Sequence, residues 1–187
     1  MTVSSRTYFF SFLPLIFLFS NSQLNENIIN EFLYLIVNTG YIIIFYLLII
    51  LTVPIVDKTQ KLIDRSALGI STFIYSVSHF LLYIVDNDIM MAILLEDFLN
   101  LTYIQIGYIA FILFIPLALT SNPLSKKVLN ISWYNLHKIV YIIIVASLIH
   151  YYLIIKADYL IFYIYVFLFL SVVFLKYILS LKMDRKR

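Results

Sequence analysis

The sequence has no cysteine among its 187 residues. This absence excludes disulfide bonds, zinc–thiolate sites, iron–sulfur clusters and covalently attached c-type haem. Charged residues are also scarce, at 12%, whereas soluble domains have about 25%. Because 63% of the residues are hydrophobic, we expect lipid rather than water to surround most of this chain.

Nucleotide-binding motifs are also missing. The chain has neither a G-x-G-x-x-G motif nor a P-loop, and it shows no internal repeat, low-complexity linker or separate soluble domain. If a nicotinamide dinucleotide supplies electrons here, another protein must therefore oxidise it.

Long apolar runs dominate what is present. A helix needs about 20 residues to cross the roughly 30 Å hydrocarbon core of a bilayer. We therefore expect an all-α integral membrane bundle of about six transmembrane helices, forming a single domain over 1–187 with its core at about 32–181. The apolar segments are 8–20, 32–55, 67–85, 104–120, 132–155 and 159–181. The first is short and follows Arg6, so a cleaved signal peptide is an alternative there.

The connecting segments alternate in charge. Segments 21–31 and 86–102 have acidic residues and no Lys or Arg, and the latter is long enough to lie along the membrane surface. Cytoplasmic loops are enriched in Lys and Arg. The pattern predicts a multi-pass protein with both termini in the cytoplasm, and only Lys156 departs from it. The basic residues of the cytoplasmic connections and tail are Lys58, Lys61, Arg65, Lys126, Lys127, Lys182, Arg185, Lys186 and Arg187.

The three histidines, His79, His137 and His150, all lie in apolar segments. A polar side chain in lipid needs a partner, so ionisable residues at this depth are functional candidates. No Asp or Glu lies deep in these segments, which disfavours a proton or ion pathway. A packing or interfacial histidine is the alternative at each single position.

His79 and His150 are expected at the same depth. His79 lies seven residues before Asp86 and His150 six before Lys156, on helices that run in the same direction. At about 1.5 Å per residue, both rings lie roughly 9–10 Å below the outer ends of their helices. Two imidazoles at one level can hold a haem iron from both faces.

His137 lies thirteen residues before His150, so it is about 20 Å nearer the cytoplasm and cannot share that iron. At the corresponding depth, the helix expected over 67–85 begins near Ser66 and Arg65 and has no histidine. A second haem would therefore need a ligand other than histidine on that helix. Otherwise His137 contacts a haem propionate, a quinone or a flavin. Arg65 suits a haem propionate or a flavin phosphate, or it is an ordinary positive anchor at the membrane surface.

Several of these residues stand in recognisable motifs. They are Thr39-Gly40, residues 65–70 followed by His79 and Tyr83, Gly107 followed by residues 116–121, and residues 133–141 followed by His150-Tyr151. Together they resemble the ferric reductase-like transmembrane domain. Within it they resemble MsrQ (formerly YedZ), the family of haem-binding membrane subunits of the bacterial periplasmic methionine sulfoxide reductase system.

The resemblance implies an inner-membrane subunit that binds haem b, one or two per chain, at His79, His137 and His150, with FMN or a quinone as further cofactors. Electrons would come from a cytoplasmic flavin reductase or quinol. They would pass to a periplasmic molybdopterin-dependent methionine sulfoxide reductase, which carries out the substrate chemistry and repairs oxidised envelope proteins.

Two features distinguish this chain within the resemblance. The family usually has two basic residues before the Leu-Gly pair, whereas this chain has only Arg65. Wider relatives carry four histidines and often a flavin domain, so three histidines favour the shorter family. Two alternatives are a histidine-lined membrane transporter and a structural membrane protein without a cofactor.

Overall fold

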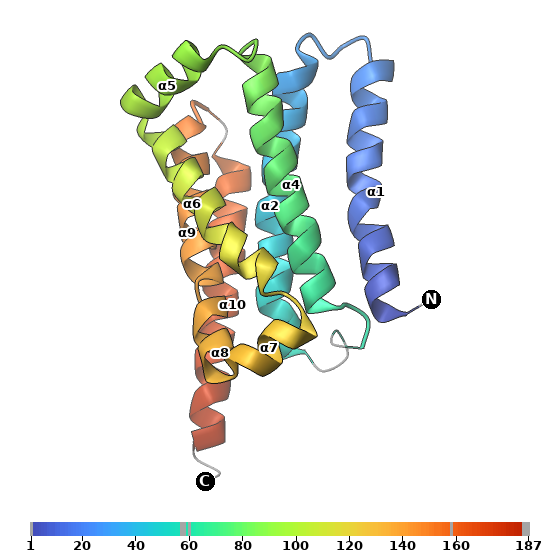
Figure 1. The fold of residues 1–187 in the computed structure, drawn as a ribbon, viewed down its shortest axis with the longest axis vertical. Coiled ribbons are helices and arrows are strands. Elements are labelled where there is room, and N and C mark those ends of the chain that lie inside the picture. The colour runs from blue at the N-terminus through green and yellow to red at the C-terminus, as the bar shows by residue number, and fades with distance from the viewer. Residues whose placement is uncertain (1, 57–58, 60, 158, 185–187) are drawn as a thin grey trace.

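The computed structural model describes residues 2–56, 59, 61–157 and 159–184, and its regular elements in these ranges are all helices (Figure 1). The expected all-α fold is confirmed, and within these described ranges six stretches are long and apolar enough to cross a membrane. The elements are α1 (Val3–Leu24), α2 (Glu31–Thr52), η1 (Val53–Ile55), α4 (Arg65–Asp86), α5 (Met91–Asn100), α6 (Thr102–Leu119), α7 (Pro123–Leu129), α8 (Ile131–His137), α9 (Val140–Ile154) and α10 (Leu160–Asp184).

Several helices begin at a residue whose side chain caps them. The Asp64 carboxylate accepts hydrogen bonds from the backbone amides of Ser66 and Ala67 at the start of α4. Asn30 does the same for α2, through the amide of Leu33. Such caps satisfy amides that have no partner within the helix, which matters most where the helix enters lipid.

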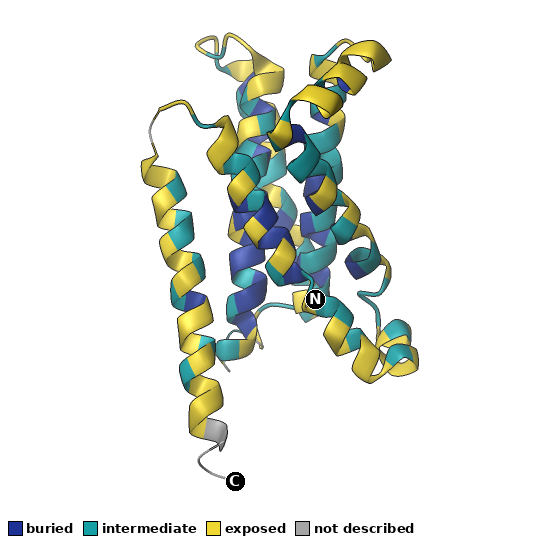
Figure 2. Cartoon of the chain, turned by 90° about the vertical axis from the view of Figure 1, so that its left-hand side faces the viewer, coloured by how far each residue is buried: buried dark blue, intermediate teal, exposed yellow. Residues whose placement is uncertain are grey.

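Helix α2 lies at the centre of the bundle, packed mainly against α4, while α6 packs mainly against α9. Half of the membrane-crossing stretch of α2 is buried inside the bundle, whereas only 6% of the stretch in α10 is buried. Leu47, Leu51, Ile143 and Ile144 are fully buried where α2 meets α9. Figure 2 shows α10 as a mostly exposed helix at the edge of the bundle, a surface suited to lipid.

Buried hydroxyl groups join α1 to its neighbours. The hydroxyls of Ser11 and Ser71 lie 2.7 Å apart, and the Ser11 carbonyl accepts hydrogen bonds from Tyr46 at 2.8 Å and Tyr75 at 2.9 Å. Polar contacts of this kind hold membrane helices together, where burial of apolar surface provides no driving force. In this structure the first apolar segment is therefore an integral part of the bundle.

The fifth apolar segment differs from the single helix expected from hydropathy. It divides into α8 and α9 at Lys138 and Ile139, whose amides bond to carbonyls three residues back instead of four. A tighter turn joins the two helices here, and α8 packs against α7 at this end of the bundle. His137 is the last residue of α8.

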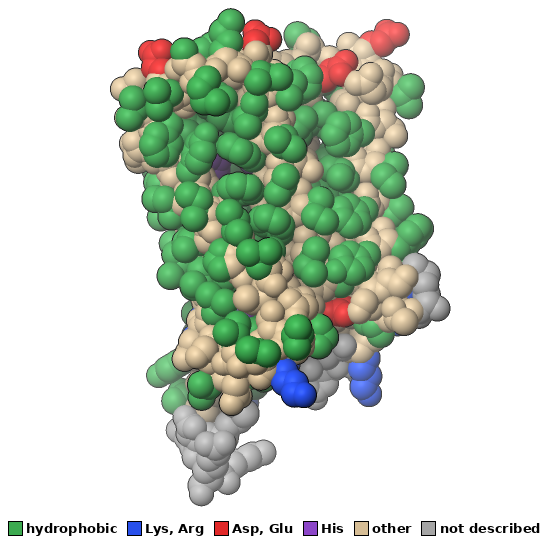
Figure 3. All heavy atoms as spheres, in the orientation of Figure 1, with side chains coloured by type: hydrophobic (Ala, Val, Ile, Leu, Met, Phe, Trp, Pro, Cys, Tyr) green, Lys and Arg blue, Asp and Glu red, His purple; other side chains and the backbone are tan. Residues whose placement is uncertain are grey.

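Charge is divided between the two ends of the bundle. Acidic side chains gather at the end that carries α5, and basic ones at the end where both termini lie (Figures 1 and 3). The loop 86–102, expected along the membrane surface, forms the short helix α5. Lys58, Asp158, Arg185, Lys186 and Arg187, which belong to the predicted charge pattern, lie outside the described residues.

Candidate functional site

His79 on α4 and His150 on α9 face one another in the half of the bundle nearer α5. Their ring centroids lie 6.3 Å apart, with an angle of 75° between the ring planes. Both residues are intermediate in burial, and Figure 3 shows a histidine between apolar side chains on this face. The equal depth expected from counting residues thus corresponds to real proximity.

The hydrogen bonds of both rings use Nδ1. His79 Nδ1 lies 3.0 Å from the Ile36 carbonyl oxygen and 3.1 Å from Oγ1 of Thr39. His150 Nδ1 lies 2.6 Å from the Tyr103 carbonyl oxygen. A carbonyl oxygen can only accept, so each Nδ1 carries the proton and each Nε2 keeps its lone pair. Metal-binding histidines are commonly oriented in this way.

The spacing fits one haem iron between the two rings. A bond between a metal and an imidazole nitrogen is about 2 Å long. Two imidazoles on opposite sides of one metal therefore have centroids roughly 6 Å apart, close to the 6.3 Å observed here. The described residues contain no cluster of three or more His, Cys, Asp or Glu suited to a bare metal ion. Haem needs only two, because its porphyrin supplies four nitrogens.

Two of the three glycines make room for these rings. A Cβ atom built on Gly40 would lie 3.4 Å from Cε1 of His79, and one on Gly107 would lie 3.0 Å from both Cε1 and Nδ1 of His150. A Cβ on Gly69 would meet nothing within 4 Å. Gly40 and Gly107 therefore let α2 and α6 pass close to the rings.

Replacing Gly107 with alanine is expected to displace the His150 ring, because the new methyl group would lie well inside the usual carbon contact distance of about 3.5–4.0 Å. The 2.6 Å bond to Tyr103 leaves the ring little freedom to yield. We expect roughly 10-fold weaker haem retention, the size of effect typical of groups that orient a metal ligand. Haem per protein after detergent washing measures it. Gly69→Ala is the control, and equal losses in both variants would contradict the packing argument.

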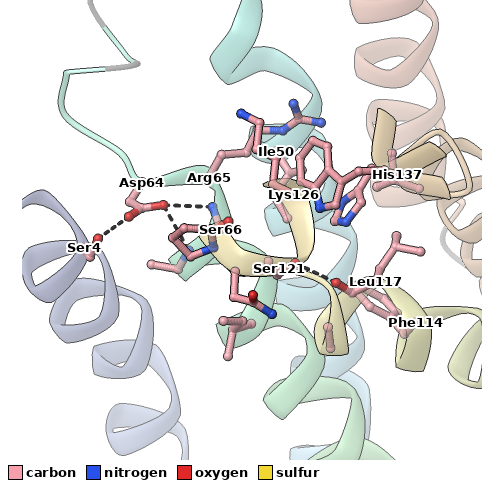
Figure 4. Close-up of a pocket in the computed structure, with 18 of the residues that line it drawn as sticks. Ser4, Ile50, Asp64, Arg65, Ser66, Phe114, Leu117, Ser121, Lys126 and His137 are labelled. Carbon is pink, nitrogen blue, oxygen red and sulfur yellow. Dashed lines mark hydrogen bonds between the residues drawn. The ribbon is translucent and has the colours of Figure 1, made fainter. Parts of the chain in front are cut away.

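A separate pocket lies at the basic end of the bundle (Figure 4). Its volume is about 780 Å³. Leu47, Ile50, Phe114 and Leu117 contribute apolar walls. The polar and aromatic lining consists of Ser4, Tyr8, Asp64, Arg65, Ser66, Ser121, Asn122, Lys126, Trp133, Tyr134 and His137, and the Asp64 carboxylate in it is already engaged as the cap of α4.

His137 is held in this pocket by two neighbours. Its ring stacks on Trp133 with centroids 3.9 Å apart, and its Nε2 lies 3.0 Å from Oγ1 of Thr120. The Thr120 hydroxyl has one proton, which it donates to the Pro116 carbonyl at 2.7 Å. His137 Nε2–H is therefore the donor to Thr120, and Nδ1 keeps the lone pair. The tautomer is the opposite of that at His79 and His150.

Arg65 and Lys126 bring positive charge to the same pocket. No hydrogen bond or ion pair joins Arg65 to any of the residues that the structure describes. Lys126 Nζ lies 5.2 Å from the centre of the Trp133 ring. A planar ligand with an anionic group fits this combination of stacked rings, apolar walls and cations.

The four predicted site residues thus lie in two places. His79 and His150 lie together between α4 and α9, and His137 and Arg65 line the pocket at the basic end of the bundle. The sequence placed Lys126 among the basic residues of the cytoplasmic connections, and it singled out Thr120 and Trp133 only as members of the motifs at 116–121 and 133–141. Trp133 lies four residues before His137, so helical spacing alone indicated a shared face. The contact of Thr120 with His137 carried no such spacing signal, because it joins residues from two different helical segments.

Comparison with known proteins adds independent information. Residues 39–148 match the model of the family described as ferric reductase like transmembrane component. This stretch includes His79 and His137 and ends two residues before His150. No solved structure matches the chain.

Curated relatives lie in the same family. Over 116 residues the chain is 39% identical to the protein-methionine-sulfoxide reductase heme-binding subunit MsrQ of Brucella ovis and of Brucella abortus, and 38% identical to that of Brucella melitensis. These alignments cover 60% of this chain and 53% of each relative, so the chain spans about half the length of the curated relatives. With more than half of its residues matching the family model, the chain belongs to the ferric reductase like transmembrane component family.

Proposed function

We propose that this protein is a transmembrane electron-transfer subunit that holds haem b between Nε2 of His79 and Nε2 of His150. The observation that carries the proposal is the 6.3 Å spacing of the two rings, each with its Nδ1–H bonded to a backbone carbonyl. When bound there, the haem would supply a one-electron couple. The similarity to relatives named heme-binding subunits supports the same cofactor.

The protein's own residues have defined tasks in this proposal. The Ile36 and Tyr103 carbonyls keep the proton on Nδ1 of each ring, which leaves the lone pair of Nε2 for the metal. Gly40 and Gly107 make room for the rings.

We assign electron entry to the pocket that contains His137 and Arg65. Its cations suit the phosphate of FMN or a haem propionate, and its apolar walls and stacked rings suit a planar head group, including that of a quinone. A second haem would take its histidine nitrogen from Nδ1 of His137, because Thr120 engages Nε2. The donor is a cytoplasmic flavin reductase or the quinol pool.

The basic end of the bundle is assigned to the cytoplasm of a bacterial inner membrane, by the positive-inside rule. Both termini are then cytoplasmic, and the His79–His150 site lies toward the periplasm. The electron acceptor proposed there is a periplasmic molybdopterin-dependent methionine sulfoxide reductase that repairs oxidised envelope proteins. The names of the Brucella relatives support this system.

The direct test is the visible spectrum of the protein purified from haem-replete cells. We expect a Soret band and, after reduction by dithionite, the α and β bands of b-type haem. A folded, monodisperse and colourless preparation would overturn the proposal. It would favour a histidine-lined transporter or a structural membrane protein instead.

A further inference from the structure

Thr39 on α2 is fully buried, although it is polar and lies in the membrane-crossing part of the bundle. Its Oγ1 lies 2.7 Å from the Leu35 carbonyl oxygen, 3.0 Å from the Ile36 carbonyl oxygen and 3.1 Å from His79 Nδ1. The first two are contacts within its own helix. The third crosses to α4 and reaches a proposed haem ligand.

The direction of the bond between Thr39 and His79 follows from a count of protons. A threonine hydroxyl has one proton, and both neighbouring carbonyl oxygens can only accept. Thr39 therefore donates along its own helix, with Leu35 the nearer acceptor. The His79 ring must be the donor, so its Nδ1–H is shared between the Ile36 carbonyl and the Thr39 hydroxyl.

We infer that Thr39 is a positioning residue for His79. By accepting from Nδ1–H, it holds the rotation of the ring and raises the strength of Nε2 as a donor to iron. This inference rests on the proposed function. An acceptor on Nδ1–H increases the basicity of the ligating nitrogen. A more basic ligand favours ferric over ferrous iron and lowers the midpoint potential of the haem.

The two proposed ligands differ in how they are held. His150 has one short bond to a backbone carbonyl, whereas His79 depends in part on a side chain. Substitution can therefore alter the environment of His79 without touching either ligand. Thr120 repeats the arrangement at His137, since it also donates to the carbonyl four residues back and accepts from an imidazole.

The test compares Thr39→Val with Thr39→Ser and Thr72→Val. Valine has the shape of threonine without the hydroxyl, and serine keeps the hydroxyl. Thr72 is the matched control, because it is also fully buried and also donates at 2.7 Å to the carbonyl four residues back, but contacts no histidine. The measurements are haem per protein and the midpoint potential from a redox titration of purified membranes.

For Thr39→Val we expect a higher midpoint potential of the haem and weaker haem retention. In Thr39→Ser and Thr72→Val, both values should stay near those of the wild-type protein. A tenfold change in the relative affinity for ferric and ferrous iron corresponds to about 59 mV. If the valine variant fails to accumulate, Thr39→Ala removes the same hydroxyl and gives the same readout.

An unchanged potential together with unchanged haem content in Thr39→Val would overturn the inference, as would an equal shift in Thr72→Val. These outcomes presuppose a wild-type protein that contains haem. A wild-type protein without haem would instead refute the proposed function, so the two failures are distinguishable.

Discussion

Replacing His150 with alanine is expected to abolish the b-type spectrum of the haem between α4 and α9. The substitution removes one of the two rings that lie 6.3 Å apart, and the methyl group of alanine cannot replace the lost nitrogen. His79→Ala should have the same effect, because each ring supplies one face of the iron. Haem per protein, with the dithionite-reduced spectrum, measures the loss.

His137→Ala is the histidine control for this experiment. It removes an imidazole from another place in the bundle. The spectrum of the haem proposed between His79 and His150, which we call the outer haem, should be unchanged. If His79→Ala and His150→Ala both kept a full wild-type spectrum while remaining folded, the ligand assignment would be wrong.

The second large effect is expected at the inner pocket. His137→Ala should leave the outer haem reducible by dithionite but slow its reduction by a quinol analogue or reduced FMN at least about tenfold, a barrier increase of roughly 1.4 kcal/mol. The reason is that His137 lines the pocket where we place the electron donor and is held there by Trp133 and Thr120. Stopped-flow absorbance of the Soret band in membrane vesicles measures the rate.

Lys127→Ala is the matched control for that rate. Lys127 lies next to Lys126 on α7 and is exposed, but it does not line the pocket. An unchanged rate in His137→Ala, or equal slowing in both variants, would place electron entry elsewhere. The haem content of His137→Ala also identifies the pocket ligand, because loss of about half the haem would indicate a second haem there.

Much of the architecture could be predicted from hydropathy and charge. Long apolar segments separated by loops of alternating charge specify helix number and direction, because lipid requires each segment to satisfy its own backbone. Helix rise then placed His79 and His150 at one depth. Depth alone could not establish which way each ring points, because rotation of a helix about its axis depends on packing with its neighbours.

Two threonines appeared in the sequence only as members of resembling motifs, and the contacts they make could not be predicted there. Thr39 and Thr120 act through contacts between helices, and threonines are common in membrane helices, where they usually bond to their own backbone. Both do so here as well, and the functional contact is an additional one. The break after His137 was equally hidden, because neither Lys138 nor Ile139 is a proline or a glycine, the residues that usually mark the end of a helix.

The central claim is that two imidazoles hold one iron, and electron paramagnetic resonance of the oxidised wild-type protein tests it most directly. We predict a low-spin ferric signal with two axial nitrogen ligands, which disappears when His79 or His150 is replaced by alanine. A high-spin, five-coordinate signal in the wild-type protein would contradict the claim, and so would a low-spin signal that survives replacement of both residues.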